Sequence, residues 1–343
     1  MISGEQLRSL GKPGRKGPLS DEAQGEWPTV ARYFLACLAT VVGCFTLVAV
    51  GFAGLRIAGD LPPPIVTNNL CFDEKLHWMS HQLPTKDADL LVFGSSVAWR
   101  HFDGEKAVES GFAKSPFNLG FCGLRMSQTA FVTKYFLNKE KFRSPLQVII
   151  IASPQDFEGC NDREERVFLE SDVDKTVFSS SRSLAAYLRN VDALAFVRNA
   201  IFVKAMRSGT IALDPLVFTN YGDGPLDTGQ SRGLTYGHIQ NLNQPCFSAL
   251  TDIAKRLTDQ NIKTIFVLNP VNPRWISEYD PDRRILNDVR VRSARALRGF
   301  DVLIWDASES SLFSVSDFVD AFHLRWSAVR RFTAAMAAFA TGG

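Results

Sequence analysis

The hydrophobic positions after residue 86 form short runs that alternate with amphipathic stretches. Apolar runs of strand length occur at 88–93, 117–119, 147–152, 263–268 and 302–305. The run at 147–152 has no polar face, which is typical of a strand at the centre of a parallel sheet that is covered on both sides.

Helical spacing of apolar residues separates these runs. It predicts helices at 126–137, 183–206, 246–259, 285–297 and 325–340, with an irregular insertion at 207–243. Alternation of strands and helices implies right-handed crossovers, and therefore an α/β fold with a parallel sheet between two helical layers. Ligands of such sheets bind beyond the carboxyl ends of the strands, and Ser96 and Ser153 each follow such an end.

One long segment, from Tyr33 to Leu55, carries no charge. About 23 helical residues span roughly 34 Å, which is enough for the hydrocarbon core of a bilayer. We therefore predict a transmembrane helix at 33–55, rather than a buried core helix or a cleaved signal peptide. Lys and Arg are denser before this segment than after it, which favours a cytoplasmic N-terminus.

The chain then divides into four parts. We expect a disordered cytoplasmic tail at 1–32, the membrane helix at 33–55, a linker and entry segment at 56–86, and an exported domain at 87–343. This topology places the protein in the inner membrane, with its domain on the periplasmic or extracellular side. The stretch Leu61-Pro-Pro-Pro64 predicts an extended spacer between the membrane and the domain.

The composition is that of a globular protein, with 45% hydrophobic residues, 22% charged residues and a net charge of +2. This balance gives no support for nucleic-acid binding. No Cys/His group has the spacing of a zinc site, and we expect neither a metal nor a cofactor. Six cysteines are present, four of them outside the membrane segment. A Cys122–Cys160 disulfide is one hypothesis for these four, and free buried thiols are the alternative.

Two short segments far apart in the sequence carry the chemistry. Gly94-Ser95-Ser96 follows the first predicted strand, and Asp320-Ala-Phe-His323 lies near the C-terminus. A serine hydroxyl becomes a nucleophile when a histidine accepts its proton, and a carboxylate fixes the tautomer of that histidine. Taken singly, the first segment is also typical of a helix N-cap, and the second of a surface turn. Together they predict serine-based acyl transfer.

Four segments in order resemble the SGNH hydrolase superfamily: LLVFGSSVAW, PFNLGFCGLRMSQT, VIIIASPQDF and Asp320-x-x-His323. The resemblance implies an SGNH-like three-layer α/β/α domain. It assigns Ser96 as the nucleophile, His323 as the base and Asp320 as the orienting acid, with Ser95 where the family commonly has Asp. The second segment implies that Gly123 donates a backbone N–H to the oxyanion, with Gly120 as the alternative.

The third segment departs from the family's Gly-x-Asn-Asp pattern. Gln155 occupies the position of the asparagine, whereas a literal Gly-Cys-Asn161-Asp occurs six residues later. The side chain that completes the oxyanion hole is therefore Gln155, or Asn161, or none.

Aromatic and basic residues beside the nucleophile are candidates for substrate contact. Aromatic faces stack on sugars, so we predict that Trp99 and Arg100 contact a carbohydrate. His101 is the best further candidate among the other histidines. The arginines between 283 and 298 are interpreted as a solvated helix face.

The membrane helix narrows the function that the resemblance implies. Membrane-anchored SGNH-like proteins of this layout include O-acetyltransferases of exopolysaccharides and the D-alanyl transfer protein of teichoic acid pathways. They typically work beside a polytopic membrane-bound O-acyltransferase. We therefore expect a serine acyltransferase that O-acetylates a cell-envelope polysaccharide with such a partner. A membrane-tethered carbohydrate esterase and a non-catalytic assembly partner are the alternatives.

Overall fold

The computed structural model describes residues 22–83, 87–143, 145–161, 165–179, 185–189, 192–208, 213–235, 238–308 and 310–342. The chain forms two compact units, which meet between Gly59 and Asp60.

The first unit consists of the helix α1, Glu22–Ala58. Its segment Thr29–Ala58 has a mean hydropathy of 2.3 and is long and apolar enough to cross a membrane. The helix begins before the predicted start at Tyr33 and includes residues 22–32, which were expected to be disordered. The rest of the predicted tail lies outside the described residues.

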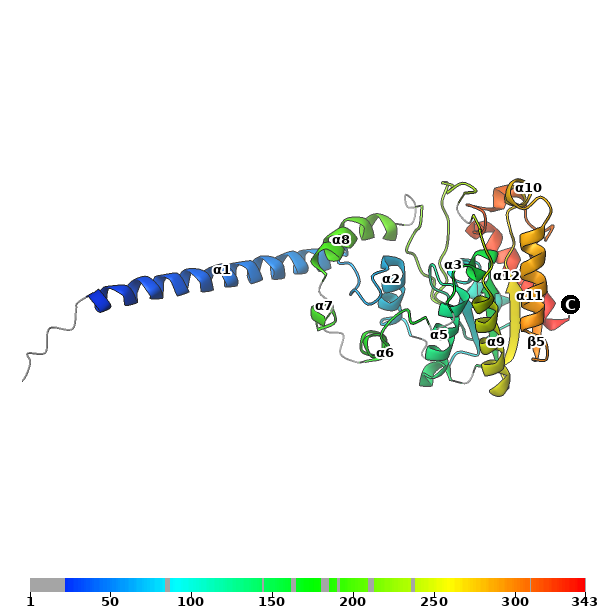
Figure 1. Cartoon of the computed structure of the whole chain (residues 1–343), viewed down its shortest axis with the longest axis horizontal. Helices are drawn as coiled ribbons and strands as arrows, with labels where there is room; N and C mark the ends of the chain where they lie inside the picture. Colours follow the sequence, from blue (N-terminus) through cyan, green and yellow to red (C-terminus); the bar gives the residue numbers. More distant parts are fainter. Residues whose placement is uncertain are drawn as a thin grey trace, which may run out of the picture. The chain divides into compact units, whose positions relative to one another are not determined.

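The second unit contains a five-stranded parallel sheet (Figure 1). Its strands are β1 Leu90–Gly94, β2 Pro116–Asn118, β3 Gln147–Ala152, β4 Lys263–Leu268 and β5 Val302–Asp306. The order across the sheet is β2-β1-β3-β4-β5, and every neighbouring pair is parallel. The five predicted strands and the α/β class are thereby confirmed.

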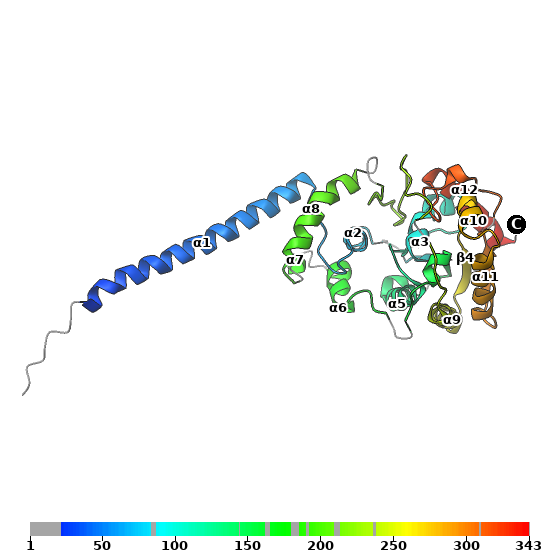
Figure 2. The ribbon, with the colours of Figure 1, turned by 45° about the horizontal axis from the view of Figure 1, so that its top comes forward.

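Helices cover both faces of the sheet, and several are short. They are α2 Leu70–Met79, α3 Ser96–Arg100, α4 Gly104–Glu109, α5 Met126–Leu137, α6 Glu170–Val173, α7 Ala185–Arg189, α8 Ala193–Arg207, α9 Gln244–Asp259, α10 Pro273–Tyr279, α11 Arg284–Ala296 and α12 Trp326–Thr341. Figure 2 shows α5 and α9 side by side, and α7 and α8 at the same end of the second unit as α2. The helix predicted at 183–206 is two helices, α7 and α8, and the sequence pattern did not predict α2.

Strand residues alternate between two hydrophobic cores. Leu91, Phe93 and Ile150 belong to the core shared with α2, α5 and α9. Leu90 and Val92 belong to the core shared with α4 and α12. Successive side chains of a strand point to opposite faces, so a central strand that is covered on both sides must be apolar throughout.

The linker after α1 is packed into the second unit. Residues 62–65 are buried, and the Tyr187 hydroxyl of α7 donates a hydrogen bond to the Pro62 carbonyl at 2.9 Å. The stretch Leu61-Pro-Pro-Pro64, predicted to be an extended spacer, is thus packed against the second unit along most of its length. Proline rings and their carbonyls pack well against neighbouring helices, and composition alone does not reveal those neighbours.

Two disulfides join elements that lie far apart in the sequence. Cys71 of α2 pairs with Cys122, and Cys160 pairs with Cys246 of α9. The hypotheses of a Cys122–Cys160 bridge and of free thiols are both wrong. The true partner of Cys122 lies on a helix that the sequence pattern did not predict.

Gly94 ends β1 in a backbone conformation with φ of +142°, which only glycine adopts easily. A Cβ atom here would collide with the Ile151 carbonyl oxygen of β3 and lie 2.7 Å from Ala98 Cβ. We expect Gly94→Ala to destabilise the protein by more than the roughly 1–3 kcal/mol of backbone strain alone. Urea unfolding of the solubilised full chain measures this loss.

Gly111→Ala is the matched control, because Gly111 also has a positive φ of +71° but open space around its missing Cβ. If both variants lose the same free energy of unfolding, the contact between position 94 and β3 does not contribute to the effect.

Candidate active site

The strand order places the candidate nucleophile at the switch point of the sheet. The chain leaves β1 toward β2 on one side, and β3 continues the sheet on the other. A crevice opens beyond the carboxyl ends of strands where the order reverses in this way. Ser96 follows β1 directly as the first residue of α3, with Ser95 at the N-cap. Ser95 is buried, whereas Ser96 is half-buried.

The structure brings Ser96, His323 and Asp320 together. His323 Nε2 lies 2.8 Å from Ser96 Oγ, and His323 Nδ1 lies 2.9 Å from Asp320 Oδ2. Because a carboxylate can only accept, Nδ1 carries the proton and Nε2 accepts from the serine hydroxyl. His323 and Asp320 are buried, so Ser96 is the member of the three that a substrate reaches. The arrangement is that of a nucleophile, a base and an orienting acid.

Asp320 is a buried, ionised carboxylate. Its Oδ1 accepts hydrogen bonds from the backbone N–H groups of Phe322 and His323, at 2.9 and 2.8 Å. Burial opposes its ionisation, but the His323 imidazole, these hydrogen bonds and Arg232 outweigh burial and lower the pKa of Asp320 to about 2. Asp320 is therefore charged over the whole physiological pH range.

Arg232 belongs to the segment that the sequence pattern interpreted as an irregular insertion. Its guanidinium lies 3.4 Å from Asp320 Oδ2. Its backbone N–H donates to the Val319 carbonyl at 3.2 Å, and Ser231 Oγ donates to the same oxygen at 2.7 Å. The insertion thus lies against the loop that carries the acid and the base. No signal in the sequence identifies Arg232, because its partner is more than eighty residues away.

His101 and Asn269 hold the backbone on both sides of His323. Asn269 Nδ2 donates to the Phe322 carbonyl at 2.7 Å, and Leu324 N–H donates to His101 Nε2 at 2.7 Å. His101 Nδ1 donates to Asn269 Oδ1, so the two residues also bind each other.

Both residues are fully buried, and burial, reinforced by the nearby His323, lowers the pKa of His101 to about 3. His101 is therefore a neutral positioning residue, and its predicted contact with substrate does not fit. Asn269 was missed, although a polar residue directly after a buried strand is a signal that could have found it.

Ser95 connects the nucleophile turn to the segment after β3. Its hydroxyl donates to Asp156 Oδ2 at 2.9 Å, and the same oxygen accepts from Ser153 N–H at 2.9 Å. Burial raises the pKa of Asp156 to about 7, against these hydrogen bonds. Asp156 thus fixes the position of its neighbour Gln155 relative to Ser96.

The two glycines proposed for the oxyanion hole differ in their hydrogen bonding. Gly120 N–H donates to Asn118 Oδ1 at 2.9 Å and is therefore already used. Gly123 is an exposed residue of the turn between β2 and α5, with φ of +70°. Gly123 remains the better candidate, and its role stays a prediction.

The helix α2 holds this turn by three contacts. The Phe72 and Phe121 rings stack with centroids 4.0 Å apart, Lys75 Nζ donates to the Gly120 carbonyl at 2.5 Å, and a disulfide joins Cys71 to Cys122. Burial lowers the pKa of Lys75 well below its usual range. Three consecutive residues of the turn, 120–122, are therefore held by one helix.

The two side chains proposed to complete the oxyanion hole are in different environments. Gln155 lies in the turn directly after β3, is half-buried, and makes no side-chain hydrogen bond to the residues that the structure describes. Asn161 is exposed, and its Nδ2 donates to Glu165 Oε1 at 2.5 Å. This geometry favours Gln155 over Asn161.

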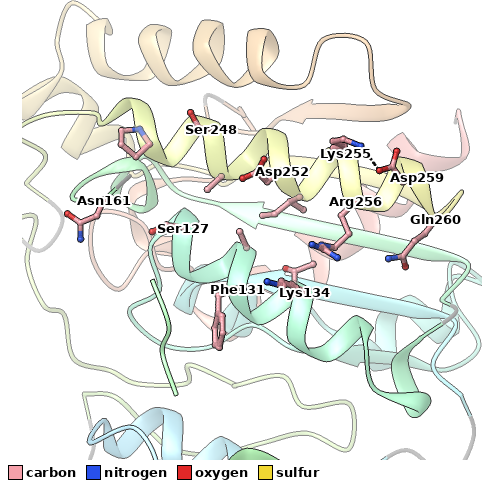
Figure 3. Close-up of a pocket in the computed structure, with 15 residues that line it drawn as sticks. Ser127, Phe131, Lys134, Asn161, Ser248, Asp252, Lys255, Arg256, Asp259 and Gln260 are labelled. Carbon is pink, nitrogen blue, oxygen red and sulfur yellow. Dashed lines mark hydrogen bonds and ion pairs between the residues drawn. The ribbon is translucent and has the colours of Figure 1, made fainter. Parts of the chain in front are cut away.

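A groove of about 670 Å³ runs between α5 and α9, and Asn161 lies at one end of it, near Ser127 (Figure 3). Charged residues of α9, among them Asp252 and Arg256, line the other part. Neither Ser96 nor His323 lines this groove, which is therefore distinct from the candidate active site.

Trp99 and Arg100 lie in the interior, each 1% exposed. The Arg100 guanidinium stacks on the Trp99 ring at 3.7 Å from its centroid and donates to the Gly224 carbonyl at 3.2 Å. The prediction that both side chains contact a sugar does not fit this burial. They instead hold the segment around Gly224 against α3.

Comparison with known families and with curated proteins finds no family model and no curated protein that matches the chain. Within the described residues, no group of three or more His, Cys, Asp or Glu side chains could hold a metal ion. The chemistry that the site supports is the transfer of the Ser96 proton to His323, in a polar setting fixed by buried side chains.

The raised pKa of Asp156 predicts a pH dependence of stability. In the unfolded chain an Asp carboxyl loses its proton near pH ~4, whereas Asp156 in the folded protein keeps it up to about pH 7. The folded state therefore binds more protons in this window, and Asp156 makes stability fall as pH rises through it.

Asp156→Asn keeps an acceptor for Ser153 and Ser95 but cannot ionise. We expect the unfolding free energy of this variant, relative to the wild type, to increase from about pH 4 to about pH 7 and to level off above. Urea unfolding at several pH values measures the difference. If the unfolding free energies of the two proteins change with pH in parallel, Asp156 ionises normally in the folded state.

Proposed function

We propose that this protein is a membrane-anchored serine acyltransferase with an SGNH-like domain. The observation that carries the proposal is the array of Ser96 Oγ, His323 and Asp320, linked by hydrogen bonds of 2.8 and 2.9 Å. The position of Ser96 after β1 and of the Asp-x-x-His element near the C-terminus supports the same family resemblance.

The array performs a two-step transfer. His323 Nε2 accepts the Ser96 proton as Oγ attacks the acyl carbonyl, and the resulting imidazolium is stabilised by Asp320. The tetrahedral oxyanion is stabilised by backbone N–H groups, with Gly123 as the proposed donor, and by the Gln155 amide. The leaving group departs with the proton from His323, which leaves an acyl group on Ser96. An acceptor hydroxyl then gives its proton to His323 as its oxygen attacks the acyl carbon, and the Ser96 Oγ–acyl bond breaks as Oγ takes that proton back.

Two observations support an exported domain. All four cysteines of the second unit are paired, and disulfides persist in oxidising compartments outside the cytosol. The apolar helix α1 precedes the domain, and the excess of basic residues before it favours a cytoplasmic N-terminus. We propose that α1 anchors the chain in the inner membrane.

The anchor favours transfer over hydrolysis. An enzyme that scavenges soluble esters gains nothing from attachment to a membrane, whereas one that receives acyl groups carried across the bilayer does. We propose that a polytopic membrane-bound O-acyltransferase supplies the acyl group, with acetyl as the expected group and a cell-envelope polysaccharide as acceptor.

The Ser96→Ala variant tests the nucleophile. We expect acetyl release from a chromogenic ester to fall at least about 10³-fold, because the acyl-enzyme can no longer form. The assay uses the solubilised full chain with and without a sugar acceptor. Ser277→Ala, an exposed serine of α10, is the matched control and should keep full activity.

The outcomes separate the alternatives. Ser96-dependent release that rises with acceptor and yields an acylated sugar supports transfer. Fast release that ignores the acceptor indicates an esterase. Unchanged polymer acylation in cells carrying Ser96→Ala would show that the protein assembles a complex without catalysing the reaction.

A second pair of variants tests the oxyanion hole. We expect Gln155→Ala to lower the rate of acetyl release by roughly 10²–10³-fold, which is the usual effect of removing one oxyanion donor. Asn161→Ala is the matched amide control and should leave the rate unchanged, because its Nδ2 is bonded to Glu165. The opposite ranking of the two variants would contradict this assignment.

A further inference from the structure

The helix α8 is apolar on its exposed side as well as on its buried side. Ala195, Asn199 and Val203 face the interior. Four large apolar residues of this helix, here named the α8 stripe, are exposed by 55–86%: Leu194, Val197, Ile201 and Phe202. Leu194, Val197 and Ile201 are spaced by three and four residues and share one face, and Phe202 lies at the edge of that face. An apolar face of this kind on a protein surface is typical of an interaction site.

The α8 stripe is held next to the point where the chain leaves α1. Lys204 of α8 forms an ion pair with Asp60 at 3.1 Å, and Tyr187 of α7 binds the Pro62 carbonyl at 2.9 Å. Asp60 is two residues beyond Ala58, the last residue of α1, and two residues span at most about 7 Å. α8 therefore stays close to the end of α1 in any orientation of the domain.

The position of α8 within the domain is also fixed. Arg207, in its last turn, forms a two-pronged ion pair with the buried Glu74 of α2, with distances of 2.6 and 2.9 Å. Such paired contacts fix the geometry of both partners. The domain thus presents the α8 stripe on a helix held at its C-terminal end.

We propose that the α8 stripe inserts into the surface of the lipid bilayer in which α1 is anchored. The proposal rests on the proposed membrane insertion of α1. The uncharged segment ends at Leu55, and three further helical residues rise about 4.5 Å, so Asp60 lies at the level of the lipid headgroups. Apolar side chains at that depth reach the boundary between headgroups and acyl chains.

The charges beside the stripe match this occupant. Arg198 is exposed on the same side of α8, where a cation can pair with lipid phosphates, whereas the nearby Lys204 is paired with Asp60. Interfacial helices typically combine such cations with a buried apolar face. Insertion fixes the rotation of the domain about its linker, and therefore the direction in which Ser96 faces the membrane.

A fluorescent label on α8 tests the proposal in the full chain. Ala205 is exposed on the same face as the stripe, one turn after Ile201, so Ala205→Cys leaves the stripe intact. The label is NBD, the background carries Ser at Cys37 and Cys44, and the chain is reconstituted in bilayers of phosphatidylcholine and phosphatidylglycerol. Val291→Cys on α11, an exposed apolar position of the same domain, is the matched control.

We expect lipids with a doxyl group near the head of the acyl chain to quench the Ala205→Cys label by about twofold or more, because interfacial helices lie ~5–10 Å deep. The Val291→Cys label should stay bright. Adding Ile201→Asp and Phe202→Asp should abolish quenching at position 205, while Ser96-dependent ester release in detergent persists.

Three outcomes overturn the proposal. If the label at position 205 is not quenched although the chain resists carbonate extraction, the α8 stripe does not enter lipid, while the proposed anchor still holds. The stripe is then available to a protein partner. If the label at position 205 is still quenched after Ile201→Asp and Phe202→Asp, the quenching results only from the covalent connection of the domain to α1, and not from insertion of the α8 stripe. Loss of the chain from the bilayer on extraction overturns both this inference and the proposed anchor.

Discussion

The candidate active site depends on a single buried charge, the Asp320 carboxylate. An isolated carboxylate in a protein interior is so costly that it normally takes up a proton. Here two backbone N–H groups of its own loop, the His323 ring and Arg232 together keep it ionised. The loop must therefore hold one shape for the charge to exist. That same shape aims His323 Nε2 at the Ser96 hydroxyl.

The remaining structure fixes this loop and its target from independent directions. Ser96 lies beyond the carboxyl ends of the neighbouring inner strands β1 and β3. The Ser95–Asp156 hydrogen bond joins the two turns that follow these strands. His101 and Asn269 hold the backbone on either side of His323. Together they hold Ser96, His323 and Asp320 in register, which is the geometry that the proposed serine-based catalysis needs.

The features predicted from sequence are those set by local patterns. Buried strands such as 147–152 have no polar face, so their apolar runs identify them, and residues just after such strands fall at the site edge. Ser96 was found in this way, whereas His323 was found from the short Asp320-x-x-His323 element. Arg232, the pairing of Cys122 and the burial of Trp99 depend on which distant segments pack together. These segments are short or irregular, and such packing leaves no periodic signal in the chain.

The helix α2 links the start of the second unit to the turn that carries the predicted oxyanion donor. Glu74 of this helix pairs with Arg207 of α8, whose neighbour Lys204 pairs with Asp60 at the exit from α1. The next residue of α2, Lys75, binds the Gly120 carbonyl, beside the disulfide of Cys122. A shift of α2 would therefore break either its ion pair with α8 or its contacts with the turn at 120–122. The candidate active site therefore has a fixed geometry relative to Asp60, the first residue of the second unit.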